Sequence, residues 1–160
     1  MTAVIFITLA AMTANAQNYS DQAKIYFAKY LTSKSMTELI TKSLPTLDDC
    51  KLVFKGQNAY TYFGVIEEMK SKLGAELQKE NETFVDIGIE IFSTQDIEQG
   101  KGNYAGGMKN IVDKLQTYVT FYKVELLREK GAEMGVAYKY WVNINGRWVF
   151  FPKPFTAFEK

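Results

Sequence analysis

The alternation of apolar and polar residues is clearest near the end of the chain, where residues 136–151 predict a β-hairpin. The alternation runs up to and away from Asn145-Gly146, and this dipeptide tolerates the positive φ angles that a two-residue type I′ turn needs. Counting outward from the turn predicts the register of the two strands. The expected pairs are Ile144 with Arg147, Asn143 with Trp148, Val142 with Val149, Trp141 with Phe150, and Tyr140 with Phe151.

The two faces of this hairpin differ in polarity. One is nearly all hydrophobic and is expected to lie on the core: Val136, Tyr138, Tyr140, Val142, Val149 and Phe151. The other mixes aromatic and polar side chains, and contiguous exposed apolar surface usually marks an interface. We favour cover by the same face of a partner subunit, with the interface residues Trp141, Trp148, Phe150 and Lys139. The alternative is a platform that binds a sugar or a peptide.

Two more strands are predicted at residues 83–92 and 118–128, where apolar residues recur with a period of two. Between them lie a polar, glycine-rich segment and a short helix near residues 108–115. A run of strands joined by short connections indicates an antiparallel meander.

Helical spacing of apolar residues dominates the chain before these strands. It predicts helices over residues 20–33, 35–43, 46–56 and 58–77. Ser35 with Glu38, and Thr46 with Asp49, have the spacing of capping boxes. Helices followed by strands predict the α+β class, with N-terminal helices packed on a curved antiparallel sheet of about four strands.

Composition excludes several classes of function. The chain has 160 residues, 47% hydrophobic and 23% charged, with a formal net charge of +1, which indicates one folded domain and no nucleic-acid partner. It has no histidine, which excludes Ser-His-Asp and Cys-His catalysis and imidazole ligands. The single cysteine, Cys50, is interpreted as a small buried hydrophobe. We expect no cofactor and no metal site.

Residues 1–16 resemble a secretory signal peptide. An apolar run at residues 3–12 is too short to span a bilayer, and Ala14-Asn15-Ala16 offers small residues where a signal peptidase cleaves. The usual basic residue at the start is missing. We expect export to the periplasm or the extracellular space, a single domain over residues 17–160, and no membrane association after cleavage.

Helices followed by a curved antiparallel sheet that ends in a long Asn-Gly hairpin resemble the cystatin-like, NTF2-like (SnoaL-like) superfamily. The likeness covers most of residues 17–160 and depends on the order of the elements and on the Asn145-Gly146 hairpin. It implies a sheet wrapped around the helices as a cone, whose mouth holds a ligand in some members. It also implies that subunits often pair through the outer face of the sheet.

Asp86 and Glu90 are the candidate catalytic pair. They lie four residues apart on one predicted strand, hence on one face, near Lys123, Glu125 and Lys139 of neighbouring strands. Two carboxylates whose pKa values are separated by burial can act as acid and base. An isomerase or hydro-lyase with one of them as base and a tyrosine as acid is therefore the alternative function. It requires a closed cavity and raised pKa values.

The glycine-rich residues 100–107 fit neither a Walker loop nor a dinucleotide-binding motif, and we interpret them as a hinged loop with Tyr104 as its lid. The preferred function is an exported, non-catalytic module that binds a small apolar or aromatic ligand or forms a homodimer. The ligand is expected between the long helix and the sheet, against Tyr62, Tyr104, Tyr138 and Tyr140. A structural envelope protein that associates through Trp141 and Trp148 is a further alternative.

Overall fold

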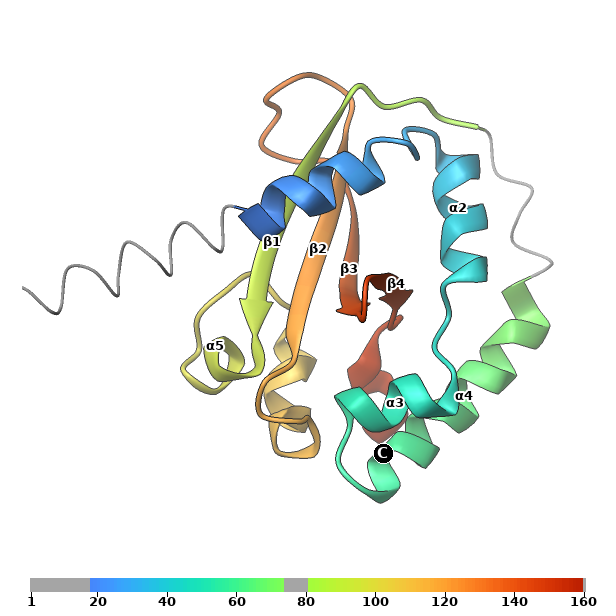
Figure 1. The fold of residues 1–160 in the computed structure, drawn as a ribbon, viewed down its shortest axis with the longest axis vertical. Coiled ribbons are helices and arrows are strands. Elements are labelled where there is room, and N and C mark those ends of the chain that lie inside the picture. Colours follow the sequence, from blue (N-terminus) through green and yellow to red (C-terminus); the bar gives the residue numbers. More distant parts are fainter. Residues whose placement is uncertain (1–17, 74–80, 160) are drawn as a thin grey trace, which may run out of the picture.

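A computed structural model describes residues 18–73 and 81–159. At its centre is a four-stranded antiparallel sheet in the order β1-β2-β3-β4 (Figure 1). The strands are β1 (Asp86–Ser93), β2 (Thr120–Leu127), β3 (Val136–Ile144) and β4 (Arg147–Phe150). The predicted α+β class and antiparallel meander are thereby confirmed. The signal-peptide prediction for residues 1–16 lies outside the described residues.

Helical segments precede, interrupt and follow this sheet. A helix over residues 18–27 leads to α2 (Ser33–Lys42), α3 (Leu47–Val53) and α4 (Gln57–Leu73). Between β1 and β2 lie α5 (Thr94–Glu98) and the 3₁₀ helix η1 (Gly106–Lys114), and a second 3₁₀ helix, η2 (Pro154–Phe158), follows β4. Among the described residues, no helix is long and apolar enough to cross a membrane.

The helix starts test the predicted capping boxes. α3 begins as predicted, because Thr46 and Asp49 each accept a hydrogen bond from the other's backbone N–H. α2 begins earlier than predicted. Its N-cap is Thr32, which forms the capping box with Ser35, so Ser35 is the third residue of the helix rather than its cap.

The hairpin has the predicted register. Ile144 pairs with Arg147, and the next pairs along the ladder follow in the predicted order up to Trp141 with Phe150. Beyond them, the backbone N–H of Phe151 donates to the carbonyl of Tyr140 at 3.0 Å. Asn145 and Gly146 both have positive φ, 51° and 84°, as the type I′ turn requires.

A β-bulge in β3 changes which side chains share a face. Between the pairs Val124–Tyr138 and Tyr122–Trp141, β3 has one residue more than β2, and Tyr140 has a φ of 73°, in the left-handed region. The extra residue turns Tyr138 and Trp141 to one face and Tyr140 to the other. The predicted single face from Val136 to Phe151 is therefore wrong. Val136 and Tyr138 lie opposite Tyr140, Val142, Val149 and Phe151.

Each face of the sheet carries its own hydrophobic core. On one face, the helix over residues 18–27 crosses β1 and β2 (Figure 1) and, with α2, packs Phe27 and Met36 against Trp141 and Trp148; we call this the Trp141 core. On the other face, α3, α4 and η1 pack against Phe121 of β2, Val149 of β4 and Phe151, which follows β4; we call this the Phe151 core. A sheet whose two faces are both covered needs bulky apolar side chains on each face. The strands of this chain carry such side chains on both faces.

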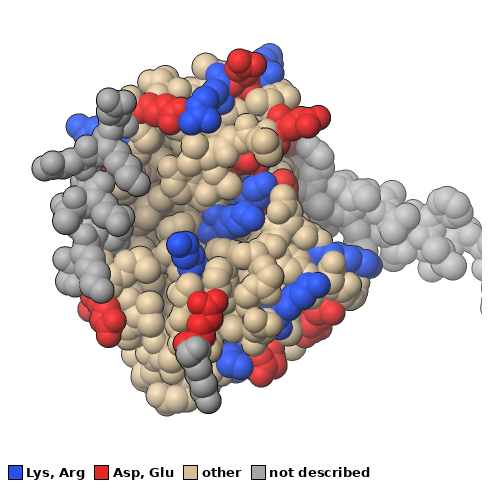
Figure 2. Space-filling model, turned by 180° about the vertical axis from the view of Figure 1, so that it is seen from behind, with Lys and Arg blue, Asp and Glu red and all other residues tan. Residues whose placement is uncertain are grey.

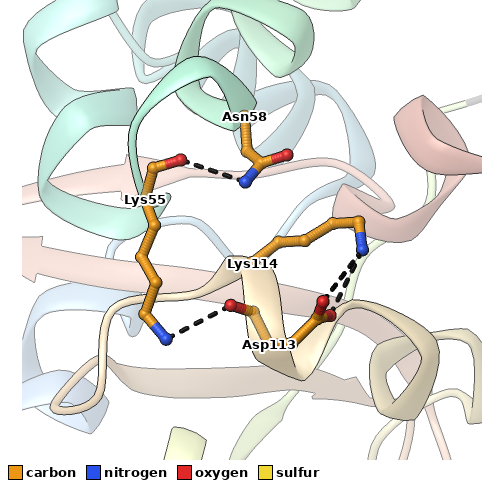
Figure 3. Close-up of polar contacts among 4 residues, drawn as sticks. All are labelled: Lys55, Asn58, Asp113 and Lys114. Carbon is orange, nitrogen blue, oxygen red and sulfur yellow. Dashed lines mark hydrogen bonds and ion pairs between the residues drawn. The ribbon is translucent and has the colours of Figure 1, made fainter.

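Polar contacts fasten the α3–α4 connection to η1, far away in sequence (Figure 3). The backbone N–H of Lys55 donates to the carbonyl of Lys114 at 2.8 Å, and Lys55 Nζ donates to the carbonyl of Asp113 at 3.2 Å. Asn58 Nδ2 donates to the carbonyl of Lys55 at 3.0 Å, and Lys114 Nζ pairs with Asp113 Oδ1 at 3.2 Å. The two contacts of Lys55 join the segments, and those of Asn58 and Lys114 are local to each segment.

Replacing Asp49 with alanine is expected to destabilise the fold by about 2 kcal/mol, because one buried carboxylate serves both a helix cap and an ion pair. Its Oδ2 accepts from the backbone N–H of Thr46 at 2.8 Å, and its Oδ1 accepts from Arg147 of the hairpin. Asp48→Ala is the matched control, since Asp48 is exposed and pairs only with Lys51 among the described residues. Urea unfolding of both variants checks this, and equal midpoints would contradict it.

Candidate functional site

A groove of about 610 Å³ lies along the first half of β3 and reaches α2 and α4. We call it the Lys139 groove. Its walls are mainly apolar, formed by Ile40, Met69, Ala137, Phe150, Pro152 and Phe155. Volumes of about 300–1,000 Å³ with such walls are typical of small-molecule sites.

The groove exists because β4 is short. β4 ends at Phe150, and Pro152 and Pro154, which have no N–H to donate, follow it. The ladder between β3 and β4 therefore begins at Trp141. Within the described residues, the stretch 136–139 of β3 has no strand on that side, and the chain from Pro152 to Phe155 forms a wall instead.

Phe155 can form this wall because Gly107 lies beneath it. A Cβ at position 107 would come within 2.6 Å of the Phe155 ring, closer than real side chains approach. The absence of a side chain at Gly107 thus lets η2 pack directly on the start of η1. Phe155 then meets the Tyr140 ring edge to face, with 6.3 Å between the ring centroids.

Tyr140 supplies a neutral polar group at the bottom of the groove. Its hydroxyl oxygen accepts a hydrogen bond from the backbone N–H of Ala105 at 3.1 Å. Burial raises the pKa of Tyr140, and the Ala105 hydrogen bond only partly offsets this. The hydroxyl therefore stays protonated at neutral pH and can donate a hydrogen bond to a ligand.

The only charged side chains among the described lining residues are those of Lys139 and Lys153. On the face of the molecule that Figure 2 shows, basic side chains lie in the middle, beside a hollow with largely uncharged walls. A positively charged mouth on an apolar groove attracts anions.

A buried charge cluster lies next to the groove on the same sheet. Lys123, whose side chain is 7% exposed, contacts Glu90 and Glu125, each at 2.9 Å. Burial alone would lower the pKa of Lys123, but its hydrogen bonds with the two glutamates raise it. For Glu125 the effects are reversed, because burial of a carboxylate raises its pKa. Hydrogen bonds from Lys123 and from the Gly135 N–H, with the charge of Lys139, outweigh burial and lower the pKa of Glu125 below its usual value.

The four tyrosines predicted to bind a ligand separate into two pairs. Tyr138 and Tyr140 line the groove. Tyr62 is fully buried beneath it, where its hydroxyl donates to the carbonyl of Pro152 at 3.0 Å. Tyr104 packs on Phe92, and its hydroxyl donates to the carbonyl of Ile97. Neither Tyr62 nor Tyr104 is among the described lining residues.

Asp86 and Glu90 have different partners in the structure. Asp86 pairs with Lys24 at 3.2 Å, while Glu90 belongs to the Lys123 cluster. A backbone hydrogen bond from Ile87, together with Lys24, lowers the pKa of Asp86, whereas the isomerase hypothesis needs a raised one. Neither carboxylate is among the described residues that line the Lys139 groove.

The chain covers its own tryptophans. Trp141 is 0% exposed and Trp148 is also buried, because Phe27 lies against both rings, with centroids at 4.9 Å and 5.0 Å. The other two predicted interface residues, Phe150 and Lys139, line the groove. Homodimer formation stays a prediction, but these tryptophans are not free to supply its surface.

Other candidate groups offer little chemistry. Burial, with the charge of Asp49, raises the pKa of the Cys50 thiol to about 12, so it is a poor nucleophile. In the glycine-rich loop, Asn103 Nδ2 donates to Glu90 at 3.4 Å. Within residues 18–73 and 81–159, no group of three or more metal-ligating side chains is close enough to hold an ion.

Sequence reasoning missed most of the groove. Helical periodicity assigns Ile40 and Met69 to helix faces but does not show that they lie beside β3. Lys153 stands out only as part of the segment that ends the sheet.

Comparison with known proteins gives no match: no family model fits the chain, and neither a curated protein nor a solved structure is detectably similar to it.

Proposed function

We propose that this protein is a non-catalytic binding module for a small, largely apolar ligand that carries one negative charge. The observation that carries the proposal is the composition of the Lys139 groove, in which apolar walls enclose about 610 Å³ and the charged lining residues are two lysines. The predicted signal peptide supports a periplasmic or extracellular location.

Each part of the ligand has a matching part of the groove. Removing its apolar surface from water against Ile40, Met69 and Phe155 contributes about 25 cal/mol per Å². An acidic group pairs with Lys139 or Lys153, and a hydrogen bond to a charged group contributes about 1.5–3 kcal/mol. The Tyr140 hydroxyl can donate a further hydrogen bond.

Titration calorimetry with three ten-carbon probes tests this proposal: decanoate, decanol and decyltrimethylammonium, each below its micelle concentration. Decanoate is expected to bind most tightly and the cation most weakly. In the Lys139→Gln/Lys153→Gln variant, decanoate affinity is expected to fall by about tenfold or more, which corresponds to about 1.4 kcal/mol.

Lys130→Gln is the matched control, because Lys130 is exposed and lies outside the groove. Its affinity for decanoate is expected to equal that of the wild type. Equal binding of decanoate and the cation, or an unchanged affinity in the double variant, would overturn the proposal.

A further inference from the structure

A second groove, of about 820 Å³, lies at the other end of the sheet. Its floor is formed by Trp148 and Tyr122 of the Trp141 core, its walls come from the helix over residues 18–27 and from α3, and its end is closed by the β3–β4 turn. We call it the Tyr118 groove. It shares no described lining residue with the Lys139 groove.

Exposed apolar side chains gather at the rim of this groove. Tyr118 is 81% exposed, and Tyr19 and Leu52 are each 55% exposed. All three line the groove, although they come from three separate segments of the chain. Solvated rings beside a buried aromatic floor are typical of a surface that a ligand covers.

None of the described side chains that line the Tyr118 groove is charged. The Lys139 groove, in contrast, has two lysines. The burial of an ionic ligand without a partner charge is costly, so the Tyr118 groove favours a neutral ligand.

Two amides leave complementary polar atoms for such a ligand. Gln22 donates through Nε2 to Asn18 at 3.0 Å, which leaves its Oε1 as an acceptor. Asn143 accepts through Oδ1 from the Gly146 N–H at 2.9 Å, which leaves its Nδ2 as a donor. A hydroxyl group is both donor and acceptor and can use either amide.

We propose that the Tyr118 groove binds a neutral oligosaccharide. Sugar rings have apolar C–H faces that fit the exposed rings of Tyr118 and Tyr19, above a floor that includes the buried Trp148. The hydroxyl groups around the edge of a sugar match the two amides. An extended peptide fits less well. The backbone N–H and C=O groups of a sheet lie in its plane and bond to the neighbouring strands, so a peptide lying on the face of the sheet finds few backbone groups to bond with.

Tryptophan fluorescence titrations with neutral hexasaccharides test this inference. The neutral probes are cellohexaose, maltohexaose and hexa-N-acetylchitohexaose. Hexagalacturonate is the charged comparison, and the neutral hexapeptide Ser-Gly-Asn-Gly-Ser-Gly is the peptide comparison. At least one neutral hexasaccharide is expected to change the emission of Trp148, with at least tenfold higher affinity than hexagalacturonate or the peptide.

The variant Tyr19→Ala/Tyr118→Ala is expected to lower this affinity at least tenfold, with an unchanged melting temperature because both rings are exposed. Tyr60→Ala is the matched control, since Tyr60 is an exposed tyrosine outside the groove, and its affinity is expected to stay at the wild-type value. The inference is overturned if no neutral hexasaccharide binds, if the double variant binds as well as the wild type, or if hexagalacturonate or the peptide binds equally well.

Discussion

Replacing Trp141 with alanine is expected to lower the free energy of unfolding by about 4 kcal/mol, the largest effect of any substitution proposed for this chain. Trp141 is 0% exposed and heads the fully buried side chains ranked by volume. Its ring lies 4.9 Å from that of Phe27 and 4.8 Å from that of Phe150. Removing it opens a cavity where a helix, β3 and β4 meet. Guanidinium unfolding followed by circular dichroism measures the loss.

Trp141→Phe separates packing from polarity. The indole Nε1 of Trp141 is buried and has no hydrogen-bond partner among the described residues, and an unsatisfied buried donor costs about 1–3 kcal/mol. Phenylalanine keeps a ring and removes that donor, so we expect it to destabilise much less than alanine. An equal loss in both variants would contradict this account of the site.

The same measurement distinguishes cover by the chain itself from cover by a partner subunit. If Phe27 and α2 of the same chain bury Trp141, the unfolding midpoint of the wild type is the same at low and high protein concentration. If a second subunit covers it, the midpoint rises with concentration, because association stabilises the folded state by mass action. We expect no such dependence.

Local signals in the sequence predicted the local structure well. Asn145-Gly146 determines a two-residue turn, and the turn determines the register, so every pair from Ile144–Arg147 to Trp141–Phe150 was predictable. The capping box at Thr46 and Asp49 works in the same way. In each case the residues that decide the structure are neighbours in the sequence.

The bulge at Tyr140 had no such signal. A left-handed φ is usually marked by glycine, asparagine or aspartate, and here a tyrosine adopts it because its ring packs among Phe92, Phe121 and Phe155. Period-two counting through this residue assigned Val136 and Tyr138 to the wrong face. Trp141 lies on the predicted face, opposite Tyr140 and Val142. That face was expected to need a partner because the sequence does not show that Phe27, far away along the chain, covers it.

The candidate site was predictable only in part, for a related reason. Tyr138 and Tyr140 were identified because they are aromatic residues on a strand, and the prolines after β4 were recognised as the end of the sheet. The groove also needs Ile40 and Met69, whose helices precede the sheet by many residues. Their position depends on tertiary packing, which helical periodicity alone does not encode.

Replacing Lys123 with methionine is expected to destabilise the fold by about 3 kcal/mol, the second largest effect, because one partner of a buried ionic cluster is lost. The Lys123 ammonium is the cation that both Glu90 and Glu125 contact. The Glu125 side chain is only 14% exposed, so water replaces little of that interaction. Glu90 is 45% exposed and is expected to contribute the smaller share.

The triple variant Glu90→Gln/Lys123→Met/Glu125→Gln tests whether this loss comes from unpaired charge. The amide introduced by Glu125→Gln would keep an oxygen to accept from the Gly135 N–H, at 2.9 Å in the wild type, and would remove the buried negative charge. Replacing every member of a buried ionic cluster is often close to neutral, so we expect the triple variant to recover most of the stability that Lys123→Met loses. If the triple variant is instead as unstable as Lys123→Met in urea unfolding, the lysine stem contributes mainly through packing. Recovery would establish that the two glutamates need Lys123 for its charge.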